Sequence, residues 1–121
     1  MPLIPARSHS FDLSTAEARA LQERLASEVI EVDQGSRPRL VAGIDIGFED
    51  GGRVTRAAVA VLDVESLALV ESALARRPTT WPYVPGLLSF REIPAALEAL
   101  ALLRSVPDLL VADGQGRAHP R

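Results

Sequence analysis

Two aspartates stand where strand-like segments would carry them, and carboxylates are the usual protein ligands of hard divalent cations. Asp45 lies in the middle of Leu-Val-Ala-Gly-Ile-Asp-Ile-Gly-Phe, and Asp113 directly follows the apolar run Leu-Leu-Val-Ala. A buried carboxylate without a partner is costly and rare, so an acid in a central strand favours a functional reading. Together the two aspartates are consistent with the metal site of a metal-dependent hydrolase.

Each of these acids also has a structural explanation. Asp45 could lie at an exposed edge or pair with an arginine, and Asp113 with Gly114 forms a common turn dipeptide. Glu92 has two readings as well, because Ser89-Phe90-Arg91-Glu92 has the spacing of a helix capping box. Its other reading is an acid at the helix start that points over the same end of the sheet as the two aspartates. One carboxylate can hardly fulfil both roles.

The segment from Trp81 to Gly86 holds the only tryptophan and the only tyrosine of the chain between two prolines. Its aromatic rings could pack over the sheet, or its Pro-x-x-Pro spacing could bind a partner with an aromatic groove. A third reading is a rigid wedge that inserts into a base stack. Three arginines flank this segment and could contact phosphates: Arg76, Arg77 and Arg91.

Composition limits the classes of function. The 121 residues allow one domain, no apolar run is long enough for a membrane span, and no export signal is visible. The absence of cysteine excludes disulfides and thiolate metal sites and fits the cytoplasm, where we expect the protein. The net charge of −3 gives no global attraction to nucleic acid, and all 13 basic residues are arginines, so no lysine is available as a catalytic base.

Hydrophobic periodicity predicts the elements that must position these residues. Residues 1–13 form an arm, and a helix over 14–31 begins at the capping box of Ser14 and Glu17 and carries a core-facing stripe of Ala18, Leu21, Leu25 and Val29. The other predicted elements are strands over 40–48, 57–62 and 67–74, a proline-rich loop over 76–86, a helix over 90–104 and a strand over 108–112.

Standard connection rules turn these elements into a topology. Three antiparallel strands form a meander, and a right-handed helical crossover then lays the fourth strand beside the first and parallel to it. Asp45 and Asp113 would then lie on neighbouring strands about 4.8 Å apart. This α/β arrangement, a mixed sheet with a crossover helix, resembles the ribonuclease H-like fold.

Three blocks of sequence extend this resemblance to a family. Ala-Gly-Ile-Asp-Ile-Gly-Phe around Asp45, the segment 82–92 and the segment 113–121 are similar to the three N-terminal signature blocks of endonuclease V, a deoxyinosine-directed DNA repair nuclease. The blocks occur in family order, and the similarity runs from about residue 15 onward. The resemblance implies Mg²⁺- or Mn²⁺-dependent hydrolysis of the second phosphodiester bond 3′ of the lesion, leaving 3′-hydroxyl and 5′-phosphate ends.

The resemblance also implies roles for individual residues. Asp45 and Asp113 would be paired metal ligands with Glu92 as a third acid, and His119, which is otherwise most simply a solvated side chain, would lie near the scissile phosphate. The remaining implied residues form two groups: a wedge of Pro82, Tyr83, Val84 and Pro85, and a pocket for the flipped base of Gly86, Leu88 and Gly114.

One departure from the family bears on activity. Family members are about twice as long, and the part after the third block supplies a further strand, a lysine and a late acid or histidine. We therefore expect residues 14–121 to be a partial ribonuclease H-like domain, truncated at the C-terminus, monomeric, with no membrane partner and with weak or no activity unless a C-terminal piece completes it. Two alternatives are an endoribonuclease specific for inosine in RNA and a non-catalytic fragment that binds nucleic acid or a protein partner.

Overall fold

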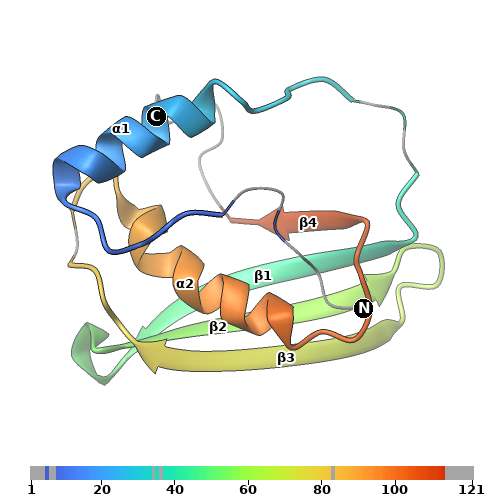
Figure 1. Cartoon of the computed structure of the whole chain (residues 1–121). Helices are drawn as coiled ribbons and strands as arrows, with labels where there is room; N and C mark the ends of the chain where they lie inside the picture. The colour runs from blue at the N-terminus through green and yellow to red at the C-terminus, as the bar shows by residue number, and fades with distance from the viewer. Residues whose placement is uncertain (1–4, 6–7, 34, 36, 83, 114–121) are drawn as a thin grey trace.

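The structure is a computed structural model that describes residues 5, 8–33, 35, 37–82 and 84–113 (Figure 1). Within these residues it has helices α1 (Thr15–Ala26) and α2 (Leu88–Ala101), a single 3-10 turn η1 (Asp50–Gly52), and strands β1 (Leu40–Glu49), β2 (Val54–Asp63), β3 (Leu69–Pro78) and β4 (Leu109–Ala112). Neither described helix is long and apolar enough to cross a membrane.

The four strands form one mixed sheet in the order β3-β2-β1-β4. β1, β2 and β3 pair antiparallel, and β4 pairs parallel to β1 after the α2 crossover. In the tight connection between β1 and β2, φ is positive at three consecutive residues: 52° at Asp50, 65° at Gly51 and 90° at Gly52. Glycine adopts positive φ without steric cost, and it occupies two of these three positions. The predicted meander, crossover helix and parallel fourth strand are confirmed.

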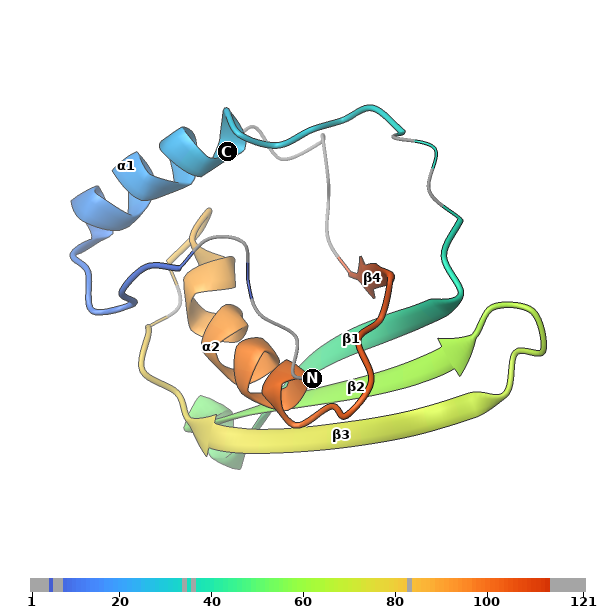
Figure 2. The ribbon, with the colours of Figure 1, turned by 45° about the vertical axis from the view of Figure 1, so that its right-hand side comes forward.

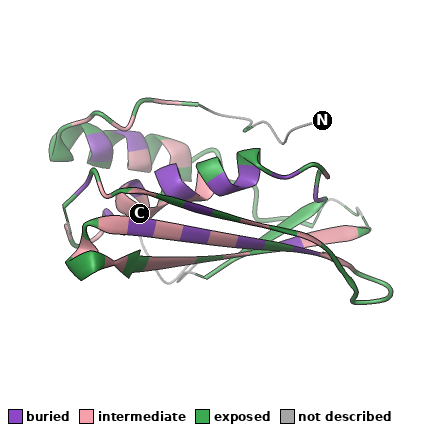
Figure 3. Cartoon of the chain, turned by 90° about the horizontal axis from the view of Figure 1, so that it is seen from below, coloured by how far each residue is buried: buried purple, intermediate pink, exposed green. Residues whose placement is uncertain are grey.

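The sheet has one covered face and one open face. α2 lies on the covered face, where alternate strand residues such as Ala42, Val59 and Val61 pack against Ala95 and Ala99 in the main core cluster. This period-two alternation of buried and more exposed residues follows from strand geometry and is visible along the strands in Figure 3. Both described helices lie on the same side of the sheet in Figures 1 and 2, and no described element covers the other side.

A second core cluster joins α1 to the start of α2. Ala18 and Leu21 of α1 pack with Trp81, Leu87 and Phe90. The predicted arm contributes too, because Phe11 packs on this cluster and its carbonyl oxygen accepts a hydrogen bond of 2.7 Å from the Trp81 indole nitrogen. The lone tryptophan is therefore buried and hydrogen-bonded, as its amphipathic side chain requires.

The predicted bounds of α1 were wrong at its C-terminal end. The capping box of Ser14 and Glu17 is present, but the helix ends at Ala26 rather than at Glu31. The hydroxyl group of Ser27 donates to the Arg24 carbonyl oxygen at 2.6 Å and competes with the helical ladder. β-branched residues follow, which favour helix weakly, and Val29 is 64% exposed rather than part of the core stripe.

Other boundaries shifted in the same way. β2 and β3 are longer than predicted, and β3 continues through Arg76 and Arg77 to Pro78, so the proline-rich loop begins later. Pairing explains the extension, because Thr55 pairs with Arg77 across the ladder. α2 begins at Leu88, two residues early, and ends at Ala101 rather than at Arg104.

The early end of α2 has a polar cause. The Glu71 carboxylate of β3 accepts hydrogen bonds from the backbone nitrogens of Arg104 at 3.0 Å and Ser105 at 2.7 Å. The Asp108 carboxylate accepts two more, from the backbone nitrogens of Arg39 at 2.9 Å and Leu40 at 3.1 Å. These two acids direct the chain from α2 into β4 and hold β4 in register with β1.

Candidate functional site

The register between β1 and β4 brings the two aspartates to equivalent positions. The parallel ladder runs from Val41 opposite Leu109 to Ile44 opposite Ala112, so Asp45 and Asp113 each follow the last pair. Both residues line one hollow of about 930 Å³ on the open face of the sheet. The adjacent positions across β2 and β3 are mostly small, including Ala58, Ala60 and Ser72, and leave space above the strands.

Glu92 belongs electrostatically to the same group of acids. Burial raises the pKa of the Glu92 carboxyl above its ordinary value of 4.5, and the negative charges of Asp113 and Asp45 raise it further, against an opposing effect of Arg91. Among the residues that the structure describes, no three acids or histidines are close enough together to hold a metal ion. The structure thus has two neighbouring aspartates, Asp45 and Asp113, and a third carboxyl group, that of Glu92, whose pKa their negative charges help to raise.

The capping-box reading of Ser89 and Glu92 is wrong. The helix N-cap is Leu87, which makes no side-chain capping hydrogen bond, so Ser89 and Glu92 lie inside the first turns of α2. Leu87 is fully buried in the second core cluster, and its backbone nitrogen closes a turn onto the Val84 carbonyl oxygen at 2.9 Å. This anchor starts the helix earlier than the polar pattern suggests and leaves the Glu92 carboxylate without a capping role.

Arg91 fixes the start of α2 against the end of β1. Its guanidinium carbon lies 4.4 Å from the centroid of the Phe48 ring, and Nη2 donates to the Gly52 carbonyl oxygen at 3.4 Å. A guanidinium over an aromatic face is an attractive arrangement. Arg91 is therefore engaged in the fold and holds the first turns of α2 against the end of β1.

The proline-rich loop divides into an anchored and an exposed part. Trp81 is buried against Phe90, with ring centroids 5.4 Å apart, so it packs on the start of α2 rather than over the sheet. Pro82 and Pro85 are exposed, whereas Val84 packs partly on the second core cluster. At the end of the loop Gly86 adopts a φ of 85°, and its carbonyl oxygen accepts a hydrogen bond of 2.9 Å from the side-chain amide of Gln22.

The remaining predicted site residues divide into two groups. Leu88 is described and lies at the first position of α2 with 40% of its surface exposed. Three others fall outside the described residues: Tyr83, Gly114 and His119.

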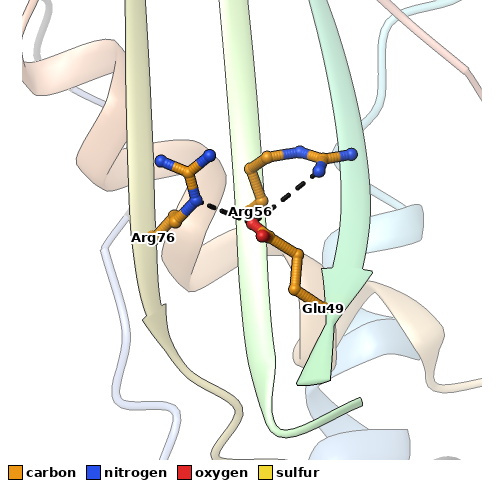
Figure 4. A network of polar contacts seen from close by, with 3 residues as sticks. All are labelled: Glu49, Arg56 and Arg76. Atoms are coloured by element: carbon orange, nitrogen blue, oxygen red, sulfur yellow. Dashed lines mark hydrogen bonds and ion pairs between the residues drawn. The ribbon is translucent and has the colours of Figure 1, made fainter. Parts of the chain in front are cut away.

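Sequence reasoning missed a charged cluster on the open face. Arg56 of β2 lies with Nη1 3.7 Å from the Glu49 carboxylate of β1, and Arg76 of β3 donates from Nε to the same oxygen at 2.7 Å (Figure 4). Period-two counting along β1 puts Glu49 on the same face as Asp45, which was the available signal. The pairing across strands, however, cannot be read from one segment alone.

Comparison with known proteins identifies the family to which the chain belongs. The sequence model of the family described as Endonuclease V matches residues 23–121. The endonuclease V of Nostoc punctiforme is 52% identical over 116 residues, which are 95% of this chain and 52% of that protein.

Solved structures agree with this match. The crystal structure of the endonuclease V from Streptomyces avermitilis is 44% identical with a TM-score of 0.83, over 97% of this chain and 51% of that one. The Ciona intestinalis endonuclease V, in complex with a 24mer DNA containing an inosine followed by a ribo-adenosine, is 26% identical with a TM-score of 0.77, over 88% of this chain and 48% of that one. This chain thus spans about half the length of the relatives that it matches.

Proposed function

Because this chain belongs to the endonuclease V family, we propose that it carries the acidic site of an endonuclease that acts on deoxyinosine in DNA. The single observation that carries the proposal is the register of β1 and β4, which sets Asp45 and Asp113 side by side on the open face. The inosine-containing DNA bound by one structural relative supports the choice of substrate. In this reading the enzyme hydrolyses the second phosphodiester bond 3′ of the lesion.

The chemistry of the three acids fits Mg²⁺ or Mn²⁺. Both ions prefer hard oxygen ligands, and Mg²⁺ is usually held by one or two carboxylates together with water and substrate phosphates. The pair of Asp45 and Asp113 meets that requirement without a third protein ligand in direct contact. A bound ion would supply activation of water and stabilisation of the leaving oxygen.

The residues of the chain have separate tasks in this proposal. Asp45 and Asp113 would hold the ion, and Glu92 adds a third carboxyl group whose pKa is raised by burial and then by the negative charges of Asp113 and Asp45, which a cation would offset. His119, in segment 113–121, lies near the scissile phosphate.

The exposed prolines of the loop suit a role in opening the duplex. Pro82 and Pro85 restrict the backbone on both sides of Tyr83 and Val84, so this segment can act as a rigid wedge. Gly86, Leu88 and Gly114 line the pocket for the flipped base. An inosine mispair costs less to open than a normal pair, which favours flipping at the lesion.

We also propose a division of the chain into an arm over 1–13 and a nuclease domain over 14–121, expected in the cytoplasm as a monomer. Phe11 and Leu13 link the arm to the second core cluster. Because the chain spans about half the length of its relatives, the proposal concerns the site that this half carries, and we expect weak or no nicking by this chain on its own.

RNA is the second candidate substrate, and a specific observation favours it. The DNA in complex with the Ciona intestinalis relative contains an inosine followed by a ribo-adenosine, so a ribonucleotide is present next to the lesion in that complex. Comparing cleavage of matched DNA and RNA oligonucleotides, each with one inosine, separates the two substrates.

The test of the proposed function is nicking, in the presence of Mg²⁺, of a duplex with one deoxyinosine by this chain completed with a C-terminal piece. Asp45→Asn and Asp113→Asn remove a charge with little change in shape, and both should abolish nicking. Asp50→Asn is the matched control, because Asp50 lies in the η1 turn with a positive φ that asparagine also tolerates. Nicking that survives in the two site variants, or that is lost equally in the control, contradicts the proposal.

A further inference from the structure

The cluster of Glu49, Arg56 and Arg76 has more positive than negative charge. The two arginines share one Glu49 carboxylate, so the cluster keeps a net charge of +1 on a face that otherwise carries acids. The arginine side chains are 40% and 53% exposed. In Figure 4 the three side chains lie in front of the strands with α2 behind them, which puts the cluster on the open face.

Gly47 explains how Arg56 reaches across β1. Gly47 and Arg56 are direct partners in the antiparallel ladder. A Cβ atom at Gly47 would overlap Nη2 of Arg56 and lie 3.1 Å from its Cζ. Gly47 is not among the described glycines with positive φ, so its backbone does not require glycine. The missing side chain at this position instead provides the space in which the guanidinium lies.

This placement brings a cation close to the candidate acids. Gly47 lies two residues beyond Asp45 on the same face of β1, which corresponds to about 6.8 Å along a strand. The Glu49 oxygen is 3.7 Å from Nη1, a distance that orients the guanidinium electrostatically but is too long for a direct hydrogen bond. The Nη donors therefore remain suited to an incoming anion.

We propose that Arg56, seated over Gly47 and oriented by Glu49, contacts a backbone phosphate of the nucleic acid next to the acidic site. This inference rests on the proposed function and names how that site holds the strand. A guanidinium can bind a phosphate through two parallel hydrogen bonds. In a chain with a net charge of −3 and no lysine, a local arginine is what offsets repulsion between the phosphates and the carboxylates.

Arg76 contributes to the same contact at longer range. Its Nε is already bound to Glu49, so it holds the carboxylate in place. Arg76 therefore acts as a positioning residue for Arg56 through Glu49.

The test measures binding of the full chain to a fluorescently labelled duplex with one deoxyinosine, by anisotropy over a range of salt concentrations and without divalent cations. Arg56→Gln should weaken binding and reduce the slope of log affinity against log salt by about 0.9, the value for one lost phosphate contact. Arg53→Gln is the matched control, because Arg53 is 81% exposed, lies beside the η1 turn and pairs with Asp50. It should leave the slope unchanged.

Gly47→Ala is the sharper variant, because it keeps every charge and only displaces the guanidinium. It should weaken binding like Arg56→Gln, and it should cost nothing further when Arg56 is already Gln, since the two changes act on one contact. Thermal unfolding of each variant confirms that it is folded. Wild-type binding by Gly47→Ala, an effect of Arg56→Gln no larger than that of Arg53→Gln, or no binding of DNA by the wild-type chain overturns the proposal.

The outcomes separate this proposal from the proposed function. Arg56-dependent binding, with no nicking by the chain completed with a C-terminal piece, supports the phosphate contact and contradicts the nuclease. Nicking that depends on Asp45 but not on Arg56 or Gly47 supports the nuclease and contradicts the phosphate contact.

Discussion

The side of the sheet that α2 covers and the side that it leaves open are built from the same strands but from different residues. On the covered side Val59 and Val61 are almost fully buried, and the core continues into α2. On the open side the neighbouring residue Ala60 is exposed, and Asp45 and Asp113 line a hollow. Burial on one side thus supplies stability, while the other side has small and charged residues around an open hollow.

The difference between the two sides shows how the fold tolerates the electrostatic cost of the acidic site. Burial raises the pKa of the Glu92 carboxyl, and the nearby negative charges of Asp113 and Asp45 raise it further, so the acidic site has an electrostatic cost. This cost is tolerated because the packed side of the sheet supplies the stability. The comparison predicts that matched substitutions on the two sides differ strongly in their effect on stability.

The largest effect is expected for a cavity on the covered side. Leu103, 3% exposed in the main core cluster, should cost about 2–5 kcal/mol in the free energy of unfolding when it is replaced by Ala. Leu74→Ala is the matched control, because Leu74 is 46% exposed and lines the open hollow, and its cost should stay within about 0.5 kcal/mol. Chemical denaturation of both variants checks this, and equal losses would refute the contrast between the two faces.

An intermediate effect on stability is expected when the pH is lowered. Hydrogen bonds from the backbone nitrogen of Arg104 and from Ser105 hold the pKa of Glu71 below its ordinary value of 4.5. A group whose pKa is lowered by folding stabilises the fold above its ordinary pKa and loses that contribution as the pH falls through the folded value. The unfolding temperature should therefore drop below about pH 4.5.

Asp108, whose pKa is lowered from 3.8 by hydrogen bonds from the backbone nitrogens of Leu40 and Arg39, extends this loss to lower pH. Glu71→Gln should lower stability near neutral pH and flatten the acid dependence. Glu65→Gln is the control, since its carboxylate accepts neither of the backbone hydrogen bonds that Glu71 accepts. An unchanged acid profile in Glu71→Gln would show that this acid does not hold the end of α2.

The smallest effect on stability is expected at the acidic site itself. Asp45→Asn removes one of the charges that raise the pKa of Glu92, so the unfolding temperature should stay the same or rise slightly. Differential scanning calorimetry measures it, with Asp50→Asn for comparison. A marked loss of stability would mean that Asp45 is a structural residue rather than a ligand.

Much of the fold was predictable because its strongest signals are local. Alternation along residues 40–48 locates β1, and the capping box of Ser14 and Glu17 starts α1 as predicted. The boundary errors arose where tertiary contacts override local preference. Burial of Leu87 starts α2 early, and the Glu71 carboxylate captures the backbone nitrogens just after it ends.

The candidate site was predictable in part for the same reason. The placement of Asp45 and Asp113 follows from strand order, because parallel pairing of the first and fourth strands sets the end of β4 beside the middle of β1. The position of Arg56 over Gly47 depends instead on the register between two strands, and no single segment encodes it. Likewise, a sequence pattern cannot tell a capping glutamate from one inside the helix, as Glu92 demonstrates.

The most direct test of the central claim, that Asp45 and Asp113 form one cation site on the open face, is a titration of the ¹⁵N-labelled chain with Mn²⁺ followed by NMR. We expect the paramagnetic ion to broaden the amide signals around Asp45 and Asp113 first, and the Asp113→Asn variant to lose this effect. The acidic η1 turn at Asp50 provides an internal control in the same spectrum. Broadening that begins at Asp50, or that persists unchanged in Asp113→Asn, would contradict the claim.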